Sequence, residues 1–360
     1  MRKIVLGFLL FAFCVKSYGQ NDDGFVYMHA RDLQLVGKAM QEGGLFHRVD
    51  TAKFRDMPIA VKRLFTNSSG LAISFVTNST EIKAKWTVPS KKQYPNMTPI
   101  MQKGLDLYIR KEGTWQHAGV GIPKGVNSAC VLVESMNREE KECLLYLPLY
   151  DEITNLQIGV RRDAYLKKQA NPFKGKIVVY GSSITQGASA SRPGLAYPSI
   201  LSRSSGWQFI NFGLSGRGKM ELSVANMLAQ IEDVDAFVLD CIPNPSPKEI
   251  EERTVDFVQT IRARHKDVPI IIIQSLIREK GNFNQKVRTK GIQQKEAIDK
   301  QVKLLYKMGV KNLYYIREDD FLGTDHEGTI DGVHPTDQGF GILLKKIKPV
   351  LAEILDMDFH

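Results

Sequence analysis

Two patterns of hydrophobic and polar residues divide the chain near residue 170. Between residues 26 and 160, short segments alternate apolar with polar side chains and are separated by turn-forming residues. A period of two is typical of strands with one buried face, so we predict about eight strands here. Many short strands in succession favour an antiparallel, jelly-roll-like β-sandwich, which we place at residues 20–170.

Two of these segments, residues 71–76 and 81–86, are joined by the run Thr-Asn-Ser-Thr. Asn, Ser and Thr favour turns because their side chains form hydrogen bonds to nearby backbone groups. The pattern therefore predicts that the two segments form a β-hairpin.

After residues 171–175, which we interpret as a linker, the pattern changes. Continuous apolar runs at 176–180, 209–212, 236–240, 269–273 and 313–316 alternate with helical patterns at 197–204, 220–231, 249–265, 291–308 and 338–355. Strands without polar alternation are typical of a parallel sheet covered by helices on both faces. We therefore predict an α/β domain over residues 171–360.

The N-terminus has the pattern of a secretory signal. Arg2 and Lys3 precede an apolar run over residues 4–15, and the segment ends in small residues at Gly19. We predict a signal peptide at residues 1–19 with cleavage after Gly19, and a secreted or periplasmic mature protein. The run is too short to span a bilayer and no later segment reaches ~18 apolar residues, so no membrane insertion is expected.

Composition narrows the class of protein. Hydrophobic residues make up 43% of the 360 and charged residues 24%, which excludes disordered, collagenous and coiled-coil chains. The formal net charge of +10 comes from Lys and Arg residues that are spread along the whole chain. Nucleic-acid binding needs a concentrated basic patch, so no nucleic-acid partner is expected.

Four cysteines are too few to form a disulfide scaffold in a chain of this length. Cys14 lies in the predicted signal peptide, which leaves Cys130, Cys143 and Cys241 and permits at most one disulfide. Cys130 and Cys143, in adjacent strand-like segments, are the pair that it would join. Two free thiols are the alternative, and we favour it.

Residues with catalytic potential follow four of the predicted parallel strands. These are the serine pair at residues 182–183, the glycine-rich turn at residues 213–218, Asn244 and, in one turn, Asp331 and His334. Taken singly, each fits an ordinary helix cap or turn. Because the carboxyl ends of parallel strands share one edge of the sheet, we expect all five to converge there. A serine beside a histidine–carboxylate pair and oxyanion donors indicates nucleophilic acyl transfer.

These blocks resemble the SGNH (GDSL-type) hydrolase superfamily over residues 176–350. The resemblance implies a flavodoxin-like three-layer domain with a five-stranded parallel sheet. It also implies that Ser183 is the nucleophile, His334 the base and Asp331 its orienting carboxylate. The backbone N–H of Ser183, together with Gly216 and Asn244, would form the oxyanion hole.

The chain departs from the superfamily pattern at Ser182, where Asp is usual, and at Pro243, where Gly is usual. The run Gly-Leu-Asp-Leu-Tyr at residues 104–108 resembles the G-x-D-L-Y domain of one bacterial branch. In that branch Ser or Thr at position 182 and the run D-C-x-P-N are usual. The resemblance therefore implies that both departures are features of the branch.

The resemblance implies an ester substrate, and three features favour O-acetyl groups on carbohydrate. The chain has a predicted secretion signal, a β-sandwich of the kind that accompanies glycan enzymes, and no long apolar lid. We expect Arg192, Tyr197 and Arg217 to line a polar pocket, although surface or structural roles are equally open. Neither H-E-x-x-H nor C-x-x-C occurs, so we expect no metal and no cofactor.

Two other functions stay open. One is a lipid or aryl esterase, including a lysophospholipase-like hydrolase, which uses the same reaction with an apolar substrate. The other is a non-catalytic glycan-binding protein whose hydrolase domain has lost activity.

Overall fold

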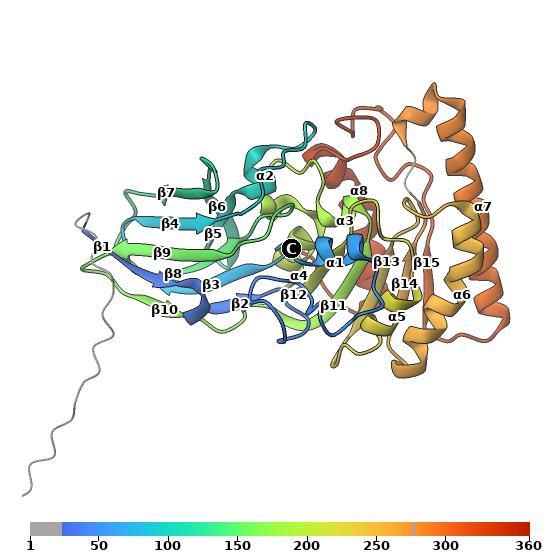
Figure 1. Ribbon diagram of the computed structural model, residues 1–360, viewed down its shortest axis with the longest axis horizontal. Helices are drawn as coiled ribbons and strands as arrows, with labels where there is room; N and C mark the ends of the chain where they lie inside the picture. Colours follow the sequence, from blue (N-terminus) through green and yellow to red (C-terminus); the bar gives the residue numbers. More distant parts are fainter. Residues whose placement is uncertain (1–23, 276–277) are drawn as a thin grey trace, which may run out of the picture.

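The computed structural model describes residues 24–275 and 278–360. The predicted signal peptide lies outside the described residues. Within them, no helix is both long enough and apolar enough to cross a membrane. An N-terminal β-rich domain lies beside a C-terminal α/β domain, as Figure 1 shows.

Two antiparallel sheets form the β-rich domain. The first has the order β1 (Phe25–His29), β9 (Asn155–Arg161), β4 (Ile82–Thr87), β7 (Asn127–Val133). The second has the order β10 (Leu166–Lys168), β3 (Ala72–Thr77), β8 (Lys141–Tyr146), β5 (Leu105–Lys111), β6 (Thr114–Gly121), with β2 (Gln34–Val36) also paired to β3. Apolar side chains of both sheets pack into one core, among them Trp86 and Ile158 of the first sheet and Phe75 and Leu145 of the second. The predicted β-sandwich is confirmed.

The predicted hairpin is wrong, because β3 and β4 belong to different sheets. Residues 78–81 carry the chain from one sheet to the other. Ser79 is buried there; its hydroxyl donates to the carbonyl of Glu81 and accepts from the backbone N–H of Arg161 on β9. Alternating apolar residues specify that a strand has one buried face, but they do not specify which strand lies beside it.

The cysteines of the sandwich are free thiols. Cys130 lies on β7 and Cys143 on β8, in opposite sheets. Burial raises the pKa of both thiols.

The α/β domain contains a parallel sheet with the order β12 (Trp207–Gly213), β11 (Lys174–Gly181), β13 (Ala236–Asp240), β14 (Ile270–Ile273), β15 (Leu313–Ile316). This order is that of the flavodoxin-like fold, which the family resemblance implies. Its helices are α3 (Ser183–Gln186), α4 (Tyr197–Ser205), α5 (Leu222–Leu228), α6 (Pro247–Arg264), α7 (Gln285–Lys307) and α8 (Asp337–Leu355), with 3-10 turns η2 (Pro193–Leu195) and η3 (Glu279–Asn282).

Helices α5 and α7 differ most from their predicted bounds. Helix α5 is shorter than residues 220–231, and Met220 has a left-handed backbone with φ of +55°, which a right-handed helix cannot include. Helix α7 begins before residue 291, where Asn284 caps it by accepting from the N–H of Val287. Its polar first turns hide this start from a search for apolar periodicity.

Helices cover both faces of the sheet. On β11, Ile177 and Val179 face the core that includes residues of α4 and α8, whereas Val178 and Tyr180 face the core that includes α5, α6 and α7. The second core also contains α1 (Ile59–Phe65) from the N-terminal part of the chain, in which Phe65 packs edge-on against a ring of β12. The N-terminal region therefore completes the core of the α/β domain as well as forming the sandwich. Two further short elements belong to it, η1 (Ala30–Asp32) and α2 (Pro99–Lys103).

A fully buried arginine links these layers. The guanidinium of Arg48 donates to the carbonyls of Asn211 and Gly213 at the end of β12, at 2.9 and 2.8 Å. It also donates to the carbonyls of Leu64 and Asn67, on the other side of the domain contact. Burial lowers the pKa of Arg48 to about 9. The strand that leads to Gly216 is thus held by a residue of the N-terminal region.

Candidate active site

Ser183 begins α3, directly beyond the carboxyl end of β11. The preceding residue, Ser182, caps this short helix by accepting from the N–H of Ile184 at 3.2 Å, so the hydroxyl of Ser183 is not used as a cap. Gly181 is required before it, because a Cβ there would lie 1.9 Å from Thr185 Oγ1. The turn places Ser183 at the sheet edge with 7% of its surface exposed.

A chain of hydrogen bonds joins Ser183, His334 and Asp331. Ser183 Oγ lies 3.0 Å from His334 Nε2, and His334 Nδ1 lies 2.8 Å from Asp331 Oδ2. Because an ionised carboxylate only accepts, the proton of the neutral imidazole is on Nδ1. Nε2 is then free to accept from the serine hydroxyl. The structure brings together three predicted residues, although Ser183 and His334 are 151 positions apart.

The carboxylate of Asp331 is held at both oxygens. Oδ1 accepts from the backbone N–H groups of Val333 and His334 at 3.0 and 2.9 Å, and Oδ2 accepts from His334 and from Asn96 Nδ2. Partial burial raises the pKa of Asp331, but the bonds from His334 and Val333 outweigh this and lower it to about 2. Asp331 is therefore ionised at neutral pH.

The expected oxyanion donors have no acceptor among the residues that the structure describes. These donors are the N–H groups of Ser183 and Gly216 and the side-chain amide of Asn244. The Oδ1 atom of Asn244 accepts from the N–H of Gly218 at 3.0 Å, which places the Asn244 side chain beside the turn that carries Gly216. Gly216 has φ of +69°, a left-handed conformation that favours glycine.

Tyr197, one of the residues expected to line a pocket, lies instead beneath the turn at residues 181–185, called the serine turn below. It is 1% exposed, and its hydroxyl donates to Asp240 Oδ2 at 2.9 Å. Thr185 donates to the same oxygen at 2.8 Å. Burial raises the pKa of Asp240 to about 6, although these two hydrogen bonds lower it in part. Tyr197 and Asp240 therefore support the turn from below.

Arg192, the second expected pocket residue, joins the two domains. Its guanidinium donates to both oxygens of Asp106 at 2.9 and 2.8 Å and also to the hydroxyl of Tyr108. Asp106 is fully buried and also accepts from the N–H of Gly194 at 2.8 Å. Asp106 and Tyr108 are the Asp and Tyr of the G-x-D-L-Y run. That run thus binds the segment that follows the serine turn.

Arg217, the third expected pocket residue, is exposed and directly follows Gly216. Of the three, it is the one placed beside an expected oxyanion donor.

Sequence reasoning missed Asn96, a residue of the loop between β4 and α2. Its Nδ2 donates to Asp331 Oδ2 at 3.0 Å, across 235 positions of the chain. No local motif marks it, because an asparagine in a Pro-containing loop is ordinary turn composition. Only the packing of the two domains brings it to Asp331.

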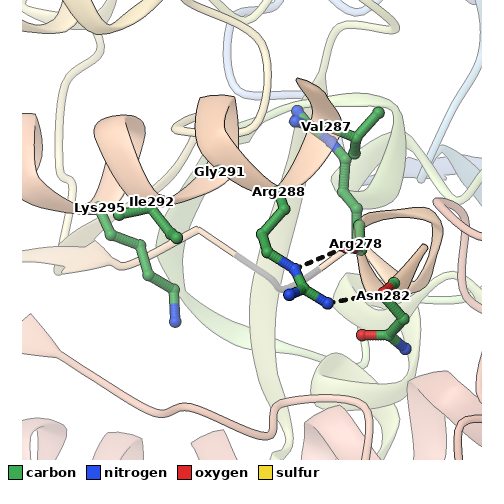
Figure 2. A pocket seen from close by; sticks show the side chains of 8 residues that line it. Arg278, Asn282, Val287, Arg288, Gly291, Ile292 and Lys295 are labelled. Atoms are coloured by element: carbon green, nitrogen blue, oxygen red, sulfur yellow. Dashed lines mark hydrogen bonds between the residues drawn. The ribbon is translucent and has the colours of Figure 1, made fainter. Parts of the chain in front are cut away.

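A separate cavity of about 290 Å³ lies between η3 and α7, as Figure 2 shows. It is lined by Arg278, Gly281, Asn282, Val287, Arg288, Gly291, Ile292 and Lys295. The guanidinium of Arg288 donates to two backbone carbonyls of η3, and Lys295 forms an ion pair with Asp319. Over residues 24–275 and 278–360, no group of three or more His, Cys, Asp or Glu side chains is arranged to hold a metal ion.

Comparison with known proteins identifies relatives of both domains. The model of the GDSL-like lipase/acylhydrolase family matches residues 174–352, and the model of the GxDLY domain, the N-terminus of SGNH-type esterases, matches residues 25–166. A crystal structure from Bacteroides ovatus, described as a GDSL-like lipase, is 66% identical over 93% of this chain and 99% of its own, with a TM-score of 0.92.

Two more distant structures share the fold. A salicylyl-acyltransferase from a tetracycline biosynthetic pathway is 18% identical over 93% of this chain and 98% of its own, with a TM-score of 0.73. A family two carbohydrate esterase from Cellvibrio japonicus is 13% identical over 92% of this chain and 98% of its own, with a TM-score of 0.60. None of the curated proteins compared with the chain matches it.

Proposed function

Because the chain belongs to the GDSL-like lipase/acylhydrolase family, we propose that it is a serine esterase that hydrolyses small acyl esters, with O-acetyl groups on carbohydrate as its substrate. The observation that carries this proposal is the hydrogen-bonded chain from Ser183 through His334 to Asp331, with separations of 3.0 and 2.8 Å.

The reaction begins with attack of Ser183 Oγ on the ester carbonyl. His334 Nε2 takes the serine proton, and the imidazolium that forms is stabilised by ionised Asp331. The tetrahedral oxyanion accepts hydrogen bonds from the N–H groups of Ser183 and Gly216 and from the amide of Asn244. His334 then donates its proton to the leaving alcohol, and an acyl-enzyme remains. Water activated by His334 releases the acid and restores Ser183.

A small acyl group is favoured by the segments on either side of the serine. Gly218 packs directly on the serine turn, where a Cβ would lie 2.2 Å from the carbonyl of Gly181. Ile242, just before Pro243 and Asn244, is fully buried and so offers no surface to a substrate. A site without an apolar cleft favours acetyl over longer chains by exclusion.

A carbohydrate alcohol is supported by two further points. The exposed Arg217 follows Gly216 and provides a polar flank for a sugar. The family two carbohydrate esterases share the fold, and one from Clostridium thermocellum was solved in complex with cellohexaose. A signal peptide at residues 1–19 would deliver the protein to where polysaccharides are found.

Exposed apolar side chains favour a second candidate, the lipid or aryl esterase. Ile330, which precedes Asp331, is 52% exposed, and Phe283 after η3 is 97% exposed. Such side chains would contact an apolar acyl chain or an aryl group.

Kinetics on p-nitrophenyl esters from C2 to C8, followed by acetate release from acetylated glycans, test the proposal. We expect kcat/KM to be greatest for acetate. We also expect Ser183→Ala to lose turnover by at least ~10³-fold, because the members of a triad act as a unit. Ser223→Ala, a serine-to-alanine change on α5, is the matched control.

Two results would contradict the proposal. A kcat/KM that rises with chain length would assign the protein to the lipid or aryl esterases. Absence of turnover with every ester, together with retained binding to glycans, would make it a non-catalytic binding protein.

A further inference from the structure

The loop between β4 and α2 brings a side chain of the N-terminal domain to Asp331. Asn96 Nδ2 donates to Asp331 Oδ2 at 3.0 Å. We propose that Asn96 is a positioning residue, which holds the carboxylate of Asp331 and through it the imidazole of His334. The inference rests on the proposed function, and it makes the N-terminal domain part of the active centre.

The bond from Asn96 completes the hydrogen bonding of the carboxylate. Oδ1 already accepts two backbone N–H groups of the Asp331–His334 turn, whereas Oδ2 accepts from His334 Nδ1 and Asn96. Without Asn96, Oδ2 would keep one partner among the residues that the structure describes, the imidazole ring that it has to orient. A carboxylate fixed at both oxygens cannot rotate away from the imidazole, and a displacement of 1 Å in such a site costs about 10²-fold in rate.

The contact between Asn96 and His334 acts through Asp331. Asn96 Nδ2 lies 3.4 Å from His334 Nδ1, but both nitrogens are donors when the Nδ1 proton points to the carboxylate. The two donors therefore share one acceptor and do not bond to each other.

Both domains hold the loop that carries Asn96. From the hydrolase side, Ser189 Oγ donates to the backbone carbonyl of Asn96 at 2.9 Å. From the N-terminal side, the buried side chain of Gln102 accepts from the N–H of Tyr94 and donates to the carbonyl of Met97, both at 2.9 Å. None of these bonds uses the side chain of Asn96, so a substitution there leaves the anchors of the loop in place.

An aromatic contact also ties the loop to the serine turn. The rings of Tyr94 and Tyr150 meet edge-on with centroids 5.4 Å apart, and the hydroxyl of Tyr150 is 3.5 Å from the carbonyl of Ser183. The position of Asn96 is therefore set relative to Ser183 as well as to Asp331.

The test compares Asn96→Leu and Asn96→Asp with wild type on p-nitrophenyl acetate. Loss of the donor in Asn96→Leu should lower kcat by about 10- to 100-fold with little change in KM. Asn137→Leu is the matched control, because Asn137 belongs to the same domain and its side-chain amide donates to the exposed Glu139, away from Asp331.

Asn96→Asp separates positioning from a purely structural role. It places a second carboxylate against Asp331, where the neighbouring ionisable groups are His334 itself, Lys280, which packs against Gly332, and Asp337, which binds the N–H of Ser191. An added negative charge favours the imidazolium, so the acid limb of kcat/KM should move to higher pH by about one unit.

Three outcomes overturn the inference while wild type is active. The first is a kcat of Asn96→Leu close to that of wild type, and the second is a pH profile of Asn96→Asp unchanged from wild type. The third is a loss of activity in either variant that is fully explained by a lower midpoint of thermal unfolding. If Asn96→Leu does not fold, the pH profile of the nearly isosteric Asn96→Asp tests the inference. A wild-type protein without turnover on any ester would overturn the proposed function instead.

Discussion

At the scale of single residues, the serine turn depends on a carboxylate that solvent does not reach. Asp240 accepts from Thr185 and Tyr197 and its backbone carbonyl accepts from the N–H of Ser182. The side chain carries no compensating cation among these contacts, so its ionised form is poorly solvated. This is why burial raises the pKa of Asp240 to about 6.

The raised pKa predicts a pH-dependent stability. The folded protein holds a proton on Asp240 up to about pH 6, whereas the unfolded chain releases it near the ordinary value of 3.8. The free energy of unfolding should therefore fall as pH rises from about 4 to 6, by an amount on the order of 3 kcal/mol for this group. Asp240→Asn, which cannot ionise, should lack this contribution.

Urea unfolding of wild type and Asp240→Asn between pH 4 and 7 checks this prediction. Asp256→Asn, at an exposed position of α6, is the control. A difference between wild type and Asp240→Asn that stays constant with pH would show that Asp240 is not the group responsible.

At the scale of elements, a glycine stabilises or destabilises the fold according to where it lies. Gly181 ends β11 against the serine turn, where a Cβ would lie 1.9 Å from Thr185 Oγ1 and 2.7 Å from the carbonyl of Asp240. Gly291 lies inside α7, where a Cβ would meet nothing within 4 Å. Position 181 has no room for a methyl group. Position 291 has room for one, and its helical backbone does not require glycine.

The two alanine variants should therefore change stability in opposite directions. Gly181→Ala should lower the free energy of unfolding by about 1–3 kcal/mol, because the turn has to move to admit the methyl group. Gly291→Ala should raise it by about 0.5–1 kcal/mol, because alanine loses less conformational freedom in a helix. Denaturant titration of both variants measures the effect. Equal stability of the two would refute the close approach at Gly181.

At the scale of the whole molecule, an ion pair between Asp106 and Arg192 joins the domains. Burial raises the pKa of Asp106, and the guanidinium of Arg192 lowers it only in part. Arg203 packs on the ring of Tyr108 at 3.9 Å, on the same side of the contact. A buried carboxylate of this kind tolerates loss of its closest cation poorly, since Arg203 would then compensate its charge only in part.

Arg192→Met should accordingly destabilise the protein by about 3–5 kcal/mol, and the double variant Asp106→Asn with Arg192→Met should be more stable than the single one. The KM of Arg192→Met for p-nitrophenyl acetate, measured below the unfolding transition, should stay near that of wild type. Thermal unfolding and steady-state kinetics measure both. Arg138→Met, which breaks the exposed pair with Asp163 at 2.6 Å, is the control. A raised KM of Arg192→Met with an unchanged free energy of unfolding would show that Arg192 contacts the substrate.

The amino-acid sequence by itself determined the fold class and the hydrogen-bonded residues Ser183, His334 and Asp331. In the N-terminal part, apolar residues alternate with polar ones because each strand buries one face. In the C-terminal part, the strands are apolar throughout and alternate with helices, because each strand is buried on both faces. Ser183, Asp331 and His334 follow strands of one parallel sheet, so their convergence follows from topology without any knowledge of distances. Local signals were sufficient because each of these features lies within one element and the turn after it.

Tertiary structure decided what depends on contacts between distant segments. The pairing of β3 and β4 with other strands, the placement of α1 in the hydrolase core, and the bonds of Arg192 and Asn96 all join segments far apart in the chain. A side chain shows in the sequence that it is polar or apolar, but not which partner will satisfy it. Tyr197 and Arg192 were expected to meet a substrate and instead satisfy buried carboxylates, because burying a charge without a partner costs more than the packing around it returns.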